Sequence, residues 1–220
     1  MMDHVETIHP TGTGEPLMAE GFWRLVEKMQ GRASPKLSFH TNGLLLTDAN
    51  IAKLLEAPIG HVVLSMDAAT APTYGRIRGG KFDRVVRNGT TFAQQVKARQ
   101  PHALLQLAMV LMVENYAEAS EFVRLAHRMG FKAVSFDHLT DPNSSPGAWV
   151  VKKDDFYFEY YDQWIRPGTR HSLASDEAVV EALDVADRLG LHVYGLNLFS
   201  EFQGKAHSHR PSREHSARFY

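Results

Sequence analysis

The 220-residue sequence contains no cysteine. This absence excludes disulfide bonds, thiolate metal ligands and cysteine nucleophiles within the chain. A charge excess is also missing, because 24 basic residues are matched by 25 acidic ones. Such a balance argues against nucleic acid or an anionic membrane surface as the main partner, since neither would be attracted to the chain.

Long apolar runs and targeting signals are missing as well. The longest apolar stretch, residues 103–113, is interrupted by Gln106 and is too short to span a bilayer. The first ten residues, MMDHVETIHP, have neither the basic nor the apolar region of a secretory signal. Because 44% of the residues are nevertheless hydrophobic, which is enough for a core, we expect a globular cytoplasmic protein.

Short β-rich runs alternate with longer amphipathic runs along the chain. The predicted strands are residues 4–9, 36–41, 61–66, 103–112, 132–137 and 191–198. The predicted helices are residues 19–29, 48–57, 82–99, 116–129, 154–165 and 176–189. This alternation indicates an α/β fold with a parallel sheet, either open or closed fully or partly into a barrel. We expect one domain over residues 1–200 and a disordered or truncated tail over residues 201–220, where the apolar pattern fails.

A glycine-rich segment, Gly12-Thr13-Gly14-Glu15-Pro16, follows the first predicted strand. Ligands of parallel sheets gather at the carboxyl ends of the strands, so this segment is a candidate binding loop. Glycine lets the backbone approach a ligand closely, and the carboxylate of Glu15 can accept hydrogen bonds from an ammonium group. Taken alone, the segment equally fits a tight turn before a helix that starts at Pro16.

Polar residues also end the second and third predicted strands. Thr41-Asn42-Gly43 follows the second strand and, taken alone, predicts an Asn-Gly turn. Ser65 and Asp67 end the third strand, where they could hold ribose hydroxyls, although Asp67 could instead cap the next helix. Arg76 and Arg78 come next and could either grip a carboxylate through a bidentate fork or lie in solvent.

Together, these segments resemble the ordered motifs of the radical S-adenosylmethionine superfamily, especially the branch that carries a C-terminal SPASM domain. The matching stretches are GTGEPL at 12–17, TNGLLLT at 41–47, SMDA at 65–68, YGRIRGG at 74–80 and MVEN at 112–115. The resemblance is good over residues 4–140 and loose over residues 141–200. It implies a partial, TIM-like (βα)6 barrel that is truncated at its N-terminus, with Asn115 at a strand end near the ligand.

The resemblance further implies that these strand ends bind S-adenosylmethionine. The residues that match binding positions of the family are Gly14, Glu15, Thr41, Asn42, Ser65, Asp67, Arg78 and Asn115. Gly14 and Glu15 would lie at the amino group of the methionine moiety. Ser65 and Asp67 would lie near the ribose or the methionine carboxylate, and Arg78 would pair with a carboxylate.

The sequence departs from the family in one respect. Family members hold a 4Fe–4S cluster with three cysteines, usually spaced CxxxCxxC, in a loop that precedes the glycine-rich segment. Because the cluster reduces S-adenosylmethionine, we expect this polypeptide to be inactive alone, as a fragment or as a degenerate relative. The implied substrate is a peptide or a small molecule, and an exposed sheet edge predicts self-association.

Two other classes of function stay open. A non-catalytic binding or scaffold protein on the same fold would need no cluster. A metal-dependent barrel enzyme would use histidine and aspartate ligands. The candidate ligands near strand ends are His4, His9, His40, His138, Asp67 and Asp137, and the tail adds His207, His209 and His215. The aromatic run at residues 156–161, in a predicted helix, is either core or a surface for peptide binding.

Overall fold

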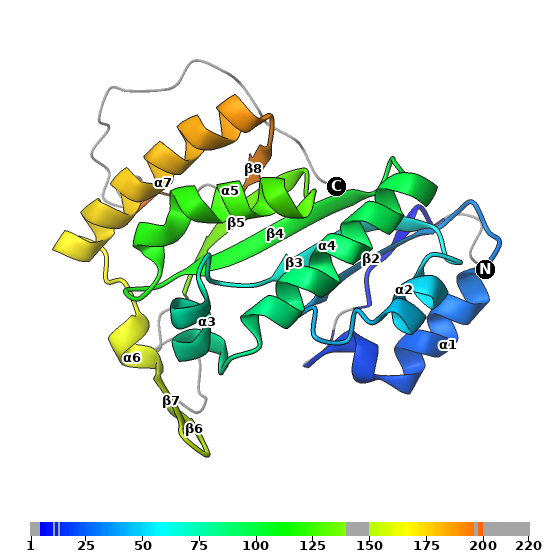
Figure 1. Ribbon diagram of the computed structural model, residues 1–220, viewed down its shortest axis with the longest axis horizontal. Coiled ribbons are helices and arrows are strands. Elements are labelled where there is room, and N and C mark those ends of the chain that lie inside the picture. Colours follow the sequence, from blue (N-terminus) through cyan, green and yellow to red (C-terminus); the bar gives the residue numbers. More distant parts are fainter. Residues whose placement is uncertain (1–4, 11, 13, 140–149, 196–197, 200–220) are drawn as a thin grey trace.

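A six-stranded parallel sheet organises the chain in a computed structural model that describes residues 5–10, 12, 14–139, 150–195 and 198–199 (Figure 1). In spatial order, the strands are β1 (Thr7–Ile8), β2 (Lys36–Thr41), β3 (Ile59–Ser65), β4 (Leu104–Leu111), β5 (Ala133–His138) and β8 (His192–Tyr194). Every neighbouring pair in this sheet is parallel. The predicted α/β fold with a parallel sheet, open as in a partial barrel, is confirmed.

Helices connect the successive parallel strands of the sheet. They are η1 (Pro16–Met18), α1 (Glu20–Met29), α2 (Asp48–Leu54), α3 (Ala71–Arg78), α4 (Phe82–Arg99), η2 (Tyr116–Glu118), α5 (Ala119–Met129) and α7 (Arg170–Leu189). Threonine hydroxyls of Thr47, Thr70 and Thr169 accept hydrogen bonds from the first turns of α2, α3 and α7. Since Thr70 caps α3, the alternative that Asp67 caps this helix is wrong.

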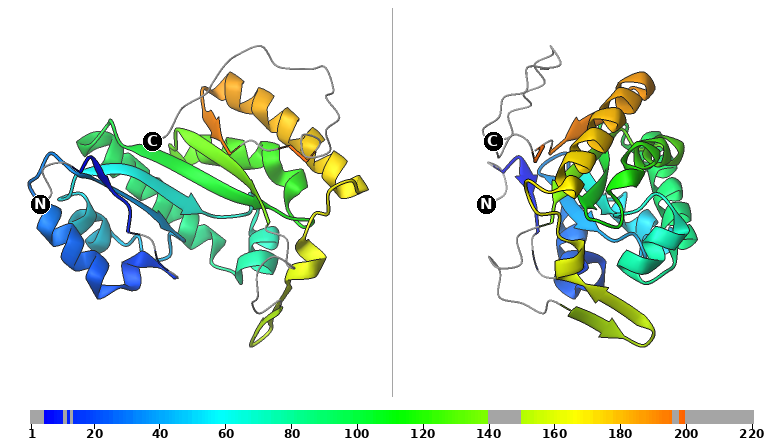
Figure 2. Two further views of the ribbon diagram at one scale, coloured as in Figure 1. Left: turned by 180° about the vertical axis from the view of Figure 1, so that it is seen from behind. Right: turned by 90° about the vertical axis from the view of Figure 1, so that its left-hand side faces the viewer.

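One face of the sheet is apolar and packs beneath the helices. Successive residues of a strand point to opposite faces, so every second side chain of β2–β5 contributes to this packing. The Phe39 ring of β2 lies 5.2 Å from that of Phe22 in α1, and Phe136 of β5 lies 6.2 Å from Phe122 in α5. The right-hand view of Figure 2 shows α4 and α5 together on one side of the strands.

The opposite face of the sheet is mostly polar, and we call it the polar face. Its side chains on β2–β5 are Lys36, Ser38, His40, His61, Val63, Ser65, Leu104, Gln106, Ala108, Val110, Ala133, Ser135 and Asp137. The strand register sets His40 beside Val63, Val63 beside Gln106, and Val110 beside Asp137. A sheet face that is lined by imidazole, hydroxyl, carboxamide and carboxylate groups is suited to a polar ligand rather than to a helix.

The prediction of an aromatic helix over residues 154–165 is wrong. The structure has an antiparallel hairpin of β6 (Val150–Lys153) and β7 (Phe156–Glu159), followed by the short helix α6 (Tyr160–Gln163). Alternation explains the strand, because Tyr157 is 58% exposed while Phe156 packs against Gly79 at the end of α3. The hairpin projects from the body of the molecule below α6 (Figure 1).

Other boundaries differ less from the predictions. The last strand is His192–Tyr194 rather than residues 191–198, and the helix before it begins at Arg170 rather than at residue 176. Within the described part of residues 4–9, only Thr7–Ile8 forms a strand. The predicted tail, residues 201–220, lies outside the described residues.

Strands β1 and β8 form the two edges of the sheet, each paired on one side. Self-association through an edge therefore stays a prediction. Across the described ranges, no helix combines the length and the apolar character that crossing a membrane requires.

The packing under the sheet predicts opposite effects of alanine at two helical glycines. A Cβ atom on Gly89 of α4 would lie 2.6 Å from Met129 Cε and 2.9 Å from Leu64 Cδ2. Both neighbours are almost fully buried, so Gly89→Ala should lower the free energy of unfolding by about 1–2 kcal/mol. A Cβ atom on Gly75 of α3 would have no contact within 4 Å. Gly75→Ala should therefore raise the free energy of unfolding by about 0.5–1 kcal/mol. Urea denaturation of both variants checks this packing, which a stabilised Gly89→Ala protein would contradict.

Candidate functional site

The carboxylate of Glu15 is held at the ends of β1 and β2. Thr41 donates its hydroxyl hydrogen bond to Glu15 Oε1 at 2.6 Å, and the backbone N–H of Asn42 donates to Oε2 at 2.7 Å. The backbone N–H of Leu17 approaches Oε1 at 3.4 Å, so Glu15 also caps η1. These donors fix the direction of the carboxylate.

The turn after β2 explains why Thr41 and Asn42 can serve Glu15. Gly43 has a φ of 75°, a conformation that favours glycine, and its N–H donates to the Thr41 hydroxyl at 3.1 Å. The Asn42 side chain accepts from the backbone N–H of Leu44 at 3.0 Å. The predicted Asn-Gly turn is therefore confirmed, and it leaves the Asn42 N–H free to point at Glu15.

A second cluster surrounds Asp67 just after β3. Asp67 is 3% exposed and has a φ of 60°, in the left-handed region that few non-glycine residues adopt. Its Oδ1 accepts from the backbone N–H of Val110 at 2.8 Å, which ties the end of β3 to β4. Its Oδ2 pairs with the guanidinium of Arg78, whose Nε lies at 2.8 Å. The two residues that the sequence offered as separate ligand contacts thus bind each other.

Asn115 is completely buried and holds the same corner from the other side. Its Nδ2 donates to the carbonyl oxygens of Asp67 and Val110, both at 2.8 Å, and its Oδ1 accepts from the backbone N–H of Met112 at 2.7 Å. All these partners are backbone groups, so the side chain of Asn115 acts here as a structural clamp.

Sequence reasoning missed Glu118, which fixes the next residues of the β3–α3 corner. Its Oε2 accepts from the backbone N–H of Ala69 at 2.7 Å. Its Oε1 accepts from the hydroxyls of Thr70 and Thr73, at 2.7 and 2.6 Å. A glutamate at the start of a helix carries no sequence signal for such a long-range contact. The only local hint is that Glu118 follows Asn115 by three residues, which places both side chains on one helical turn.

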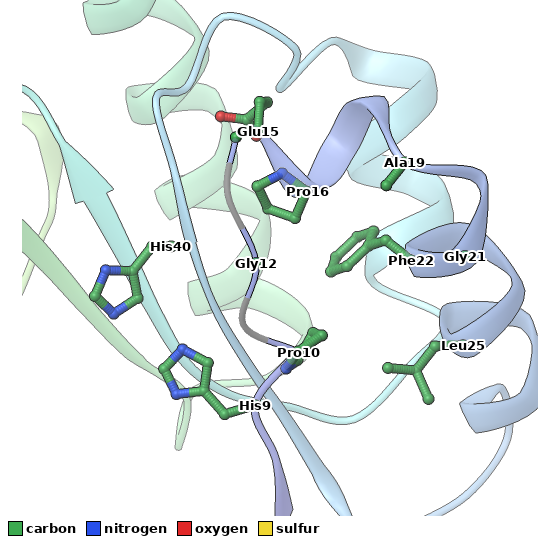
Figure 3. Close-up of a pocket in the computed structure, with 11 residues that line it drawn as sticks. His9, Pro10, Gly12, Glu15, Pro16, Ala19, Gly21, Phe22, Leu25 and His40 are labelled. Atoms are coloured by element: carbon green, nitrogen blue, oxygen red, sulfur yellow. The ribbon is translucent and has the colours of Figure 1, made fainter. Parts of the chain in front are cut away.

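A cavity of about 590 Å³ lies beside Glu15 (Figure 3). It is lined by Gly12, Gly14, Glu15 and Pro16 of the glycine-rich segment, by His9, Pro10 and His40, and by Ala19, Gly21, Phe22 and Leu25 near or on α1. The exposed backbone at Gly14, where φ is 105°, leaves one wall without a side chain. The cavity therefore joins a charged acceptor, bare backbone and an apolar wall.

The eight predicted binding residues fall into two groups rather than one. Gly14 and Glu15 line the cavity, with Thr41 and Asn42 directly behind Glu15. Asp67, Arg78 and Asn115 form the corner after β3. Ser65 lies on the polar face at the end of β3, between the two groups. Both groups lie at the carboxyl edge of neighbouring strands, as the sequence predicted.

Two histidines on the polar face, His40 and His61, are partly buried. Burial and the neighbouring His9 lower the pKa of His40, although Asp137 opposes this change. Burial lowers the pKa of His61, although the hydrogen bond from its Nε2 to Gln106 Oε1, 3.0 Å long, opposes it. The His9 and His40 rings lie 5.3 Å apart at the cavity. The lowered pKa values favour the neutral imidazoles of His40 and His61 at pH 7.

The alternative of a histidine and aspartate metal site gains no support. Within the ranges that the structure describes, no three His, Asp or Glu side chains are grouped so that they could hold a metal ion. His4 and the tail histidines His207, His209 and His215 lie outside those ranges.

Similar proteins exist among curated sequences. The chain is 34% identical over 162 residues to mycofactocin maturase MftC of Mycobacterium tuberculosis, a match that covers 72% of this chain and 40% of MftC. It is 27% identical over 139 residues to the tungsten-containing aldehyde ferredoxin oxidoreductase cofactor-modifying protein of Pyrococcus furiosus, covering 61% of this chain and 38% of that protein. The chain thus spans less than half the length of these relatives. No protein-family model matches it.

Solved structures share the fold. SuiB of Streptococcus suis, bound to its precursor peptide SuiA, matches with a TM-score of 0.60 at 14% identity over 90% of this chain and 40% of SuiB. The anSMEcpe protein with AdoMet bound matches with a TM-score of 0.60 at 16% identity over 86% of this chain and 49% of that one. With the motifs and the curated relatives, this fold assigns the class: the chain belongs to the radical S-adenosylmethionine superfamily.

The clamp at Asn115 predicts a large loss of stability on truncation. Asn115→Ala would leave the N–H of Met112 and the carbonyls of Asp67 and Val110 buried without partners. We expect the free energy of unfolding to fall by about 2–4 kcal/mol, measured by urea denaturation. A change below about 0.5 kcal/mol would contradict the proposed clamp, since exposed polar side chains give effects of that size.

The buried imidazoles predict that stability falls at acidic pH. The unfolded chain binds protons at the ordinary histidine pKa of 6.5, whereas the folded chain binds them at a lower pH because the pKa values of His40 and His61 are lowered. Stability from this difference is complete above pH 6.5 and is lost as the pH falls through the folded-state values. We expect the Tm to drop less between pH 7.5 and 5 in a His40→Gln, His61→Gln double variant than in the parent. Equal drops would refute the assignment.

Proposed function

We propose that this chain is an S-adenosylmethionine-binding core domain of a radical S-adenosylmethionine enzyme that modifies a peptide. The observation that carries the proposal is the carboxylate of Glu15, which two donors fix at the rim of a cavity at the carboxyl edge of the sheet. A fixed anion beside bare glycine backbone suits the ammonium group and the extended chain of a bound methionine moiety.

S-adenosylmethionine fits the residues present. Glu15, backed by Thr41 and Asn42, would accept hydrogen bonds from the ligand's ammonium group, while Gly14 would leave room for its backbone-like atoms. Ser65 on the polar face would reach the ribose. Asp67 and Arg78 already bind each other. They would therefore support the ligand mainly indirectly, by fixing the β3–α3 corner. When bound to a reduced cluster in this superfamily, S-adenosylmethionine supplies a 5′-deoxyadenosyl radical.

A 4Fe–4S cluster does not fit these residues. The 220 residues contain no cysteine, and the described side chains offer no other group of three metal ligands. We therefore assign ligand binding, and not reductive cleavage, to this stretch of chain. A binding role without catalysis on this polypeptide alone is the second candidate function, and the same observation favours it.

A peptide substrate is the further part of the proposal. The solved structure of SuiB contains a precursor peptide, and anSMEcpe has also been solved with peptides bound. The polar face offers hydroxyl, imidazole and carboxamide groups, which match the donors and acceptors of a peptide backbone. Membership of the SPASM branch and a cytoplasmic location complete the proposal.

Titration calorimetry with S-adenosylmethionine tests the proposed binding. We expect the parent chain to bind it and Glu15→Gln to weaken binding about tenfold or more, because a hydrogen-bonded charge pair is lost. Thr41→Val keeps the carboxylate but removes the hydroxyl that donates to Glu15 Oε1, so it should weaken binding less than Glu15→Gln. The matched control is Glu20→Gln on α1, whose carboxylate is 84% exposed and pairs only with Arg24 among the described residues. No binding by the folded parent, or equal binding by Glu15→Gln, would reject the proposal.

A further inference from the structure

The carboxylates at the carboxyl edge of the sheet differ in how well the protein satisfies them. Glu15 accepts from Thr41 and Asn42, Asp67 pairs with Arg78, Glu114 pairs with Arg76, and Glu118 accepts from three donors. Asp137, near the end of β5, accepts only from the hydroxyl of Ser135, at 3.3 Å. Among the described residues it forms no ion pair. Its carboxylate is therefore available to bind a group from outside the chain.

Asp137 is placed where a ligand can reach it. It lies on the polar face, beside Val110 of β4, and its side chain is exposed. Gly195, the residue that follows β8, lies close to it. Gly195 has a φ of 68°, and a Cβ atom at that position would lie 3.0 Å from Asp137 Oδ1. The glycine therefore keeps an approach to the carboxylate open.

Among the described residues, no lysine or arginine forms an ion pair with Asp137. The nearest titratable groups are His138 on the same strand, His40 across the sheet on β2, and the like-charged Asp67. Partial burial raises the pKa of Asp137, while the Ser135 hydrogen bond and the two histidines oppose this rise. Burial lowers the pKa of His40 and so favours its neutral imidazole at pH 7. Arg78 is already engaged by Asp67, so this part of the polar face is electronegative.

We infer that Asp137 binds a cationic amine of the substrate, which is the ammonium group of a lysine side chain or of a peptide's amino terminus. The inference deepens the proposed function and rests on it, since it assumes a peptide on the polar face. An ammonium group would complete the hydrogen bonding of the carboxylate and pair with its charge. Anionic groups would be repelled by Asp137, so the face would discriminate by charge.

The sheet also separates this position from the proposed cofactor site. Glu15 lies at β1 and β2, whereas Asp137 lies on β5, with β3 and β4 between them. The ammonium of S-adenosylmethionine bound at Glu15 therefore leaves Asp137 available for a second cation. This separation predicts that a change at Asp137 alters peptide binding and leaves cofactor binding unchanged.

The test uses the full chain saturated with S-adenosylmethionine and four short probes, with binding followed by NMR titration. The probes are acetyl-Gly-Lys-Gly-amide, acetyl-Gly-Gln-Gly-amide, acetyl-Gly-Glu-Gly-amide and Gly-Gly-Gly-amide with a free amino terminus. We expect one or both amine-bearing probes to bind about tenfold more tightly than the glutamine probe, and the glutamate probe to bind most weakly. Comparison of the lysine and free-terminus probes tells which source of the amine is preferred.

Asp137→Asn keeps the shape of the side chain and should abolish the preference for the amine, while its affinity for S-adenosylmethionine stays within about twofold of the parent's. The matched control Asp184→Asn, on the exposed surface of α7, should keep the preference. Equal affinity for all probes, no binding of any probe at millimolar concentration, or a preference that survives in Asp137→Asn would each overturn the inference. Weaker cofactor binding by Asp137→Asn would also overturn it, by assigning the residue to the cofactor. Failure of the parent to bind S-adenosylmethionine would instead refute the proposed function.

Discussion

The hydrogen bonds of the Asp67 carboxylate are the constraint on which the site depends. Asp67 adopts a left-handed backbone conformation that is unfavourable for a non-glycine residue, and it is held there by Val110 N–H and Arg78. The strained residue turns the chain from β3 into α3, so that Ala69 N–H meets Glu118 and the Asp67 carbonyl meets Asn115. Each contact joins β3 to the segment after β4, and so the edge where ligands would bind is rigid before any ligand arrives.

The same contacts divide the polar residues by role. Asp67, Arg78, Asn115 and Glu118 form their hydrogen bonds with one another, with backbone groups or with the hydroxyls of Thr70 and Thr73. Such contacts are typical of residues that support a site. Glu15 is both supported and open, because its carboxylate is fixed by two donors yet borders a cavity. A supported acceptor keeps its orientation without the ligand, so binding costs little reorganisation.

The sequence was sufficient for the sheet, because the apolar runs of β2–β5 and the threonine or glycine caps of α2, α3, α5 and α7 are local signals. It failed at residues 154–165, where an aromatic run fits helical and strand spacing equally and the hairpin is decided by packing of Phe156 on Gly79. Motif order indicated which strand ends carry the candidate binding residues. It could not reveal that Asp67 and Arg78 pair with each other, nor that Glu118 reaches Ala69, since both facts depend on how separate loops meet in space.

Membership of a cluster-dependent superfamily and a sequence without cysteine are physically compatible. The contacts that shape the cavity and the β3–α3 corner all form within residues 9–118, between carboxylates, hydroxyls, amides and one guanidinium. None of these contacts needs a thiolate or an iron atom to hold its geometry. The geometry of the cavity and of the β3–α3 corner is therefore independent of a cluster. The proposed binding of S-adenosylmethionine therefore depends on residues of this chain, whereas its reduction would require ligands that these residues do not supply.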